Sequence, residues 1–117
     1  MNIIVVDEDS ETLELLLEYG GLDKEDVRAF HSPIAAIKYA AEHEIDLAFI
    51  DCDTKVIESL NVIRYLRRIR PNCAVYVLVN DGVDIDYVSV AQHVGAADFI
   101  HKPLRETSFG FLTGAGE

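Results

Sequence analysis

The chain has 117 residues, half of them hydrophobic, and its 21 acidic residues against 10 Lys and Arg give a net charge of −11. This size and apolar content fit one domain, residues 1–117, with a single core, and the acidic balance argues against binding of nucleic acid or an anionic membrane by this domain itself. No apolar run is long enough to span a bilayer, no signal-peptide pattern is present and two cysteines are too few for a disulfide framework, so we expect a cytoplasmic protein.

The first three elements are predicted to be a buried strand, an amphipathic helix and an edge strand. Residues 2–6 form a short apolar run typical of a buried strand. Residues 9–19 predict a helix that begins at Asp9 and ends before two glycines, with an apolar face made by Leu13, Leu16 and Leu17. Residues 26–30 predict a shorter and more polar strand, which suits a sheet edge.

A second helix is predicted to start at Ser32-Pro33, because Ser is a favoured N-cap and Pro is favoured at the first helical position. Its apolar residues at helical spacing are Ile34, Ile37 and Ala41. Residues 46–50 then predict the third strand.

The second half continues the same alternation. Residues 57–69 predict a helix closed by Pro71, with apolar residues Leu60, Ile63 and Leu66. Residues 74–79 predict the fourth strand, which ends at the turn sequence Asn80-Asp81-Gly82. Further along, a helix is predicted at 84–93 and the last strand at 97–101.

Basic residues cluster at the end of the predicted helix 57–69. They are Arg64, Arg67, Arg68 and Arg70. We expect them to complement the helix dipole, and a partner-docking patch is the alternative.

The last segment, 104–117, departs from the pattern. Its apolar residues could form one helix face, but its three glycines disfavour a regular helix. We therefore expect the last helix to be short or missing, or the chain to stop before a following domain. An uncovered apolar sheet face would favour self-association.

This repeated order of strand and helix predicts an α/β fold, a doubly wound parallel sheet with helices on both faces. The first predicted strand runs directly into Asp7-Glu8, the third into Asp51 and the fifth is followed by Lys102-Pro103. Ligands of open parallel sheets bind outside the carboxyl ends of the strands. We therefore expect these acidic side chains and Lys102 to share one cleft.

These residues, together with the stretch from Gly95 to Phe99, occur in the order and at about the separations of a known family. From Met1 to about Pro103 the chain resembles the receiver domain of two-component response regulators. The resemblance implies a five-stranded, flavodoxin-like sheet of order 2-1-3-4-5 and a cis Lys102–Pro103 bond. It further implies a signalling domain rather than an enzyme, with a sensor histidine kinase or a phosphotransfer protein as its partner.

The residues support the chemistry that this resemblance implies. Asp51 would be the phosphoacceptor, because a carboxylate can attack a phosphoryl group. Asp7, Glu8 and Asp51 form a cluster of hard oxygen ligands suited to Mg²⁺, and the resemblance adds the backbone carbonyl of Asp53 as a ligand. Lys102 would pair with Asp51 before the reaction and with a phosphoryl oxygen after it. The histidines show no pairing at metal-ligand spacing, which argues against zinc.

Three positions differ from the family pattern. The fourth strand ends at Asn80 where the family has Ser or Thr, although an amide can still donate to phosphate. Lys55 and Ser59 stand where Pro and Gly are usual. The aromatic switch residue is Phe99, which lacks the hydroxyl of Tyr. We therefore expect phosphorylation at Asp51 without the usual activation switch.

Two other functions are compatible with the sequence. One is a degenerate receiver that acts as a protein-interaction or dimerisation module without phosphorylation. The other, less favoured, is a phosphohydrolase of the haloacid dehalogenase type, since Asp51-Cys52-Asp53-Thr54 resembles that nucleophile motif. In the leading hypothesis phosphorylation acts on a surface near residues 84–103, through which a homodimer could also form.

Overall fold

The computed structural model describes residues 1–52 and 56–110, and the side chains of 56 and 57 are left out of the description. Its strands are β1 (Ile3–Val6), β2 (Val27–Phe30), β3 (Leu47–Asp51), β4 (Ala74–Val79) and β5 (Asp98–His101). Its helices are α1 (Ser10–Gly20), α2 (Pro33–Glu42), α3 (Val56–Ile69) and α4 (Ile85–Val94), with short 3₁₀ helices η1 (Lys24–Asp26) and η2 (Glu106–Phe109). Apart from η1, which the sequence did not indicate, the predicted elements agree with these bounds.

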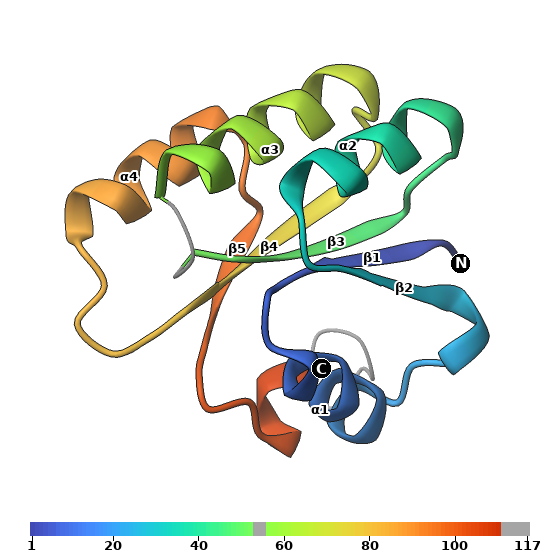
Figure 1. Cartoon of the computed structure of the whole chain (residues 1–117). Coiled ribbons are helices and arrows are strands. Elements are labelled where there is room, and N and C mark those ends of the chain that lie inside the picture. Colours follow the sequence, from blue (N-terminus) through green and yellow to red (C-terminus); the bar gives the residue numbers. More distant parts are fainter. Residues whose placement is uncertain (53–55, 111–117) are drawn as a thin grey trace.

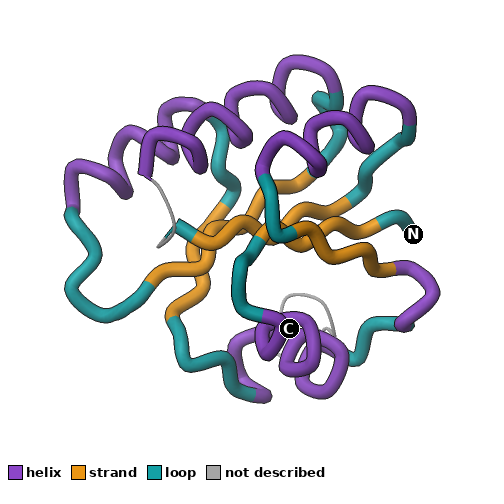
Figure 2. The backbone as a smooth tube through the Cα atoms, viewed as in Figure 1, coloured by secondary structure: helices purple, strands orange, loops and turns teal. Residues whose placement is uncertain are grey.

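All five strands run parallel in the order β2-β1-β3-β4-β5, so the expected doubly wound sheet is confirmed. Figure 1 shows α2, α3 and α4 on one face of the sheet and α1 with η2 on the other, and Figure 2 shows the strands as one twisted central layer. The central strands β1 and β3 are buried along their whole length, whereas β2 is partly exposed, as expected of an edge strand.

Several local signals act as predicted. The side chain of Asp9 caps α1 by accepting a hydrogen bond of 2.9 Å from the backbone N–H of Glu11. Gly21 ends that helix at φ 64°, a left-handed conformation that glycine adopts without a steric penalty. After β4, the N–H of Val83 bonds to the carbonyl of Asn80 and closes the predicted turn.

The buried face of α2 differs from the prediction. Ala36 and Ala40 are buried, whereas Ile34 is 66% exposed and Ala41 lies in solvent. Apolar residues occur all round this helix, so their spacing could not select the inner face. Alanine on that face lets the helix approach the sheet closely. The apolar face of α1 also differs in part, since Leu16 is fully buried but Leu13 and Leu17 are only half-buried.

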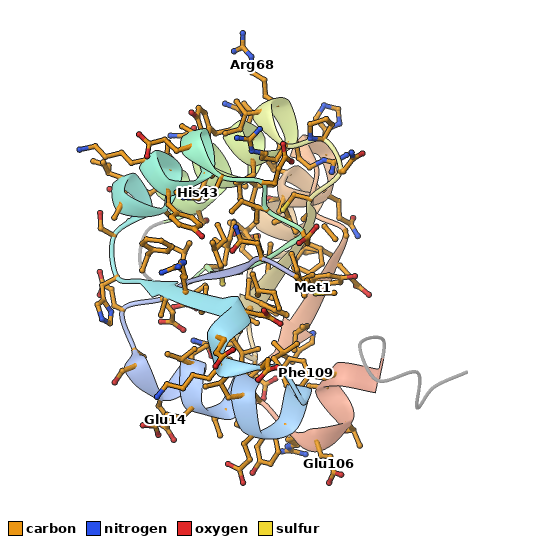
Figure 3. The ribbon with its side chains drawn as sticks, turned by 90° about the vertical axis from the view of Figure 1, so that its right-hand side faces the viewer. Met1, Glu14, His43, Arg68, Glu106 and Phe109 are labelled. Carbon is orange, nitrogen blue, oxygen red and sulfur yellow. The ribbon has the colours of Figure 1, made fainter. Side chains whose placement is uncertain are left out.

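The face that carries α1 is closed by a very short element. Phe109 in η2 is fully buried, and its ring meets Phe49 of β3 edge-on at 6.3 Å between centroids. Figure 3 shows Phe109 turned toward the sheet, while Glu106 of the same turn points to solvent. A short last helix is thus confirmed within the described residues; Phe111 and Leu112, expected to extend its apolar face, lie outside them.

The arginine cluster divides into two pairs. Arg67 donates to the carbonyls of Pro71 and Cys73, at 2.9 and 2.8 Å. Arg70 donates to carbonyls at the end of α2, at 3.0 and 2.9 Å, so it supports a neighbouring helix. Arg64 and Arg68 are exposed, and Figure 3 shows Arg68 pointing away from the molecule. Across the described residues no helix is long and apolar enough to cross a membrane.

Candidate functional site at the carboxyl end of the sheet

Three predicted site residues meet where β1, β3 and β5 end. Asp7 follows β1, Asp51 is the last residue of β3 and Lys102 follows β5. The Lys102 Nζ atom lies 3.1 Å from Asp7 Oδ2 and 3.1 Å from Asp51 Oδ1. The two carboxylate side chains are only 3% and 4% exposed, so one ammonium group bridges two buried acids from distant parts of the chain.

Backbone hydrogen bonds to neighbouring strands fix the positions of Asp7 and Lys102. The N–H of Lys102 bonds to the carbonyl of Val79 at 2.7 Å, and that of Asp7 to the carbonyl of Phe30 at 3.0 Å. Because these bonds continue the strand ladders beyond the strand ends, the two residues start from fixed backbone positions. The peptide bond between Lys102 and Pro103 is cis, as the resemblance implied.

The Asp7 carboxylate accepts three hydrogen bonds. Its Oδ1 accepts from the N–H of Asp9 at 2.9 Å, and its Oδ2 accepts from Thr12 Oγ1 at 2.5 Å and from Lys102 Nζ. Thr12 lies in the first turn of α1 and is itself buried. The start of α1 and the end of β5 therefore hold this carboxylate from two sides.

The two acids differ in their affinity for a proton. Burial raises the pKa of Asp51 to about 6; Lys102 opposes this rise and the nearby charge of Asp7 adds to it. Burial acts on Asp7 as well, but the donors Thr12 and Asp9 together with the Lys102 ammonium outweigh it and hold the pKa of Asp7 below its usual value. Burial alone would lower the pKa of Lys102, but its two carboxylate partners raise it. The ammonium thus stays charged, and Asp51 is the acid that a proton reaches first.

The other predicted site residues lie around this centre. Glu8 is exposed and lines a separate cavity of about 430 Å³ beside α2. Asn80 is exposed and lines a cavity of about 480 Å³ together with Lys102. Phe99 is half-buried and lines a cavity of about 380 Å³ together with Lys102. Asp53 and Lys55 lie outside the described residues.

In the part of the chain that the structure describes, no three His, Cys, Asp or Glu side chains are grouped so that they could hold a metal ion. The carboxylates that do meet are those of Asp7 and Asp51. Cys52, the residue after Asp51, is buried in the core between the sheet and α2–α4. His101 is exposed and lines the same cavity of about 380 Å³ as Lys102.

The comparison with protein families decides what kind of domain this is. Residues 3–109 match the model of the response regulator receiver domain. The chain belongs to this family. No curated protein matches it.

Solved structures agree with this assignment. A response regulator from Thermotoga maritima is 31% identical, with a TM-score of 0.78 over 98% of this chain and 93% of that one. The receiver domain of NtrX from Brucella abortus is 20% identical, with a TM-score of 0.79 over 97% and 96% of the two chains. A response regulator protein from Burkholderia pseudomallei, with a phosphorylated aspartic acid, a calcium ion and citrate, is 24% identical, with a TM-score of 0.75 over 92% of this chain and 62% of that one. The last two likenesses show the shared fold alone.

Two contacts of this receiver domain were missed in the sequence. The first is the contact of Thr12 with Asp7. Thr12 lies one turn before Leu16 on the buried side of α1, and this spacing could have indicated that its side chain faces inward. The second involves Ser59, which was noted only as a departure from the usual Gly. Its Oγ atom lies 2.8 Å from the hydroxyl of Tyr87, so two buried side chains join α3 to α4. No local pattern links residues 28 positions apart in this way.

Proposed function

We propose that this receiver domain accepts a phosphoryl group on Asp51 from the phosphohistidine of a sensor histidine kinase or phosphotransfer protein. One observation carries the proposal: Lys102 Nζ lies 3.1 Å from both Asp51 Oδ1 and Asp7 Oδ2 in a buried cluster. Such a cluster offers a nucleophilic carboxylate, a cation to meet phosphoryl oxygens and a second acid beside them. We also propose that the whole chain forms a single receiver-like domain.

In the proposed step a carboxylate oxygen of Asp51 forms a bond to phosphorus while the N–P bond of the donor breaks. The electron pair of the broken bond stays on the imidazole nitrogen of the donor. Lys102, already at Asp51, would then meet an oxygen of the transferred group. The nucleophile is the ionised carboxylate, and burial raises the pKa of Asp51 to about 6 in the metal-free chain, so a bound cation would favour the reactive form.

Two neighbouring carboxylates suit a magnesium ion, although no three potential ligands are grouped among the described residues. Mg²⁺ is commonly held by one or two carboxylates and keeps several waters, and Asp7 and Asp51 are two neighbouring buried carboxylates. We propose these two as ligands, with Glu8 and the backbone carbonyl of Asp53 completing the set. When bound, the ion would neutralise charge on the phosphoryl oxygens. The Burkholderia pseudomallei regulator, whose structure holds a calcium ion and a phosphorylated aspartic acid, has the same fold.

The output surface is proposed to lie near residues 84–103. Ile85 and Val90 on α4 are 79% and 43% exposed and could contact a partner or a second copy of the chain. Asn80 and Phe99 border the cavities next to Lys102 and are proposed to transmit the state of the site. The net charge of −11 argues against direct nucleic acid binding by this domain.

A degenerate receiver is the second candidate. The observation in its favour is that no three His, Cys, Asp or Glu side chains among the described residues are grouped to hold a metal ion, and Glu8 is exposed. In this case the domain would bind its partner equally well with Asp51 intact or replaced. Membership of the receiver family argues against a phosphohydrolase of the haloacid dehalogenase type.

Acetyl phosphate with and without Mg²⁺ tests the main proposal. We expect the intact mass of the wild type to increase by one phosphoryl group only when Mg²⁺ is present. Asp51→Asn should remain unmodified, while Asp86→Asn, a matched change at an exposed carboxylate on α4, should behave as the wild type. A wild type that stays unmodified under these conditions overturns the proposal and leaves the degenerate receiver.

A further inference from the structure

The hydroxyl of Thr12 is used outside its own helix. Thr12 lies in the first turn of α1, where no preceding helical turn offers a carbonyl to this hydroxyl. In α1 it instead donates to Asp7 Oδ2 at 2.5 Å, while the backbone N–H of Thr12 bonds to the carbonyl of Asp9. The side chain is 4% exposed, so this contact is shielded from water.

The hydrogen bond matters because of which oxygen receives it. Asp7 Oδ2 also accepts from Lys102, and Lys102 in turn contacts Asp51. The other oxygen of Asp7 is held by the N–H of Asp9. Thr12 is therefore the side-chain donor that ties the Asp7 carboxylate to α1, and through Lys102 it is connected to the proposed phosphoacceptor.

We propose that Thr12 is a positioning residue for the site: its hydroxyl holds the Asp7 carboxylate in the orientation that engages Lys102 and presents it to a metal ion. This inference rests on the proposed function. Groups that orient a metal ligand from outside the coordination sphere typically change metal affinity by about 10- to 100-fold when they are removed. Here the donor comes from the side chain of one residue, which can be changed without altering the backbone.

The chain offers a matched set of substitutions. Thr12→Val keeps the branched shape and removes the donor, whereas Thr12→Ser keeps the hydroxyl and removes a methyl group. Thr12 borders the cavity of about 480 Å³ beside Lys102. Thr12→Ala provides a second variant without the hydroxyl, which serves if the valine variant does not fold.

Calorimetric titration with Mg²⁺ alone is the first measurement. We expect Thr12→Val and Thr12→Ala to bind Mg²⁺ about 10-fold more weakly than the wild type or worse, and Thr12→Ser to stay within about 3-fold. Circular dichroism in EDTA would establish that each variant is folded. A loss of affinity in all three variants alike would reveal a packing effect and overturn the proposal, as would unchanged affinity in the valine and alanine variants.

The second measurement needs no metal. In EDTA, the ¹⁵N-detected ammonium signal of Lys102 reports how firmly its protons are held between Asp7 and Asp51. Faster hydrogen exchange in Thr12→Val than in Thr12→Ser supports the positioning role, and equal exchange overturns it. If the wild type binds no Mg²⁺, the proposed metal-dependent function fails, and this measurement still decides the role of Thr12.

Discussion

Replacing Asp51 with Asn should stabilise the metal-free protein at neutral pH. Burial raises the pKa of Asp51 from 3.8 to about 6, and each unit of such a shift corresponds to about 1.4 kcal/mol. The ionised Asp51 therefore lowers the unfolding free energy by on the order of 3 kcal/mol at pH values above 6. Asn removes this charge, keeps the size of the side chain and can still accept a hydrogen bond from Lys102.

The effect has a defined pH dependence. Between about pH 4 and 6 the folded chain holds a proton on Asp51 that the unfolded chain has already lost, so the stability contributed by this group falls as pH rises through that window. The advantage of Asp51→Asn should therefore be largest, about 3 kcal/mol, at pH 7.5, and should fall to about 1 kcal/mol at pH 4.5.

Asp7→Asn is the matched control, and we expect it to change the unfolding free energy in the opposite direction. The pKa of Asp7 lies below its usual value, so its ionised form stabilises the fold above the unfolded pKa, and that contribution is lost only as pH falls through the folded value. Asp7 uses both oxygens to accept from three donors, and Asn has one oxygen. We expect Asp7→Asn to lower the unfolding free energy by about 1 to 3 kcal/mol at neutral pH.

Urea unfolding followed by circular dichroism, in EDTA at the two pH values, measures both effects. The reasoning is refuted if Asp51→Asn is less stable than the wild type at pH 7.5, or if its gain is the same at pH 4.5. If both variants changed the unfolding free energy in the same direction at neutral pH, this would contradict the different proton affinities of Asp7 and Asp51.

Three further substitutions test the packing around the site. Tyr87→Phe should cost about 1 kcal/mol in urea unfolding through loss of the hydrogen bond to Ser59, and a strictly additive loss in the double variant with Ser59→Ala would contradict this coupling. Gly95→Ala should cost about 2 kcal/mol or more, because φ is 128° and the new Cβ would lie 2.1 Å from Arg67 Cγ; an unchanged thermal midpoint would disprove the clash. Arg70→Met should cost about 1 to 2 kcal/mol by removing donors to the carbonyls at the end of α2, and hydrogen exchange in that helix should increase; unchanged exchange there would refute the capping role.

Local signals were sufficient for most of the secondary structure. The Asp9 cap, the glycine stop at Gly21 and the turn after Asn80 each depend on a few neighbouring residues, and each appears as predicted. The strand order could not be obtained this way, because periodicity does not distinguish one doubly wound order from another; it came from the family resemblance. The prediction for the inner face of α2 was wrong at Ile34 and Ala41 for a related reason, since apolar residues surround that helix, whereas Ile37 does pack against the core.

The sequence by itself determined that acids follow the first and third strands and that a lysine follows the fifth, because a strand end is a local feature. Parallel pairing then brings those ends together whatever the intervening helices contain. Only the tertiary structure decided how the side chains are used there. Neighbours from other elements decide that Thr12 holds Asp7 and that the pKa of Asp51 is raised. They also decide which cavity Glu8 lines. Hydrogen bonds and desolvation act over a few ångströms in space, and distance along the chain does not encode them.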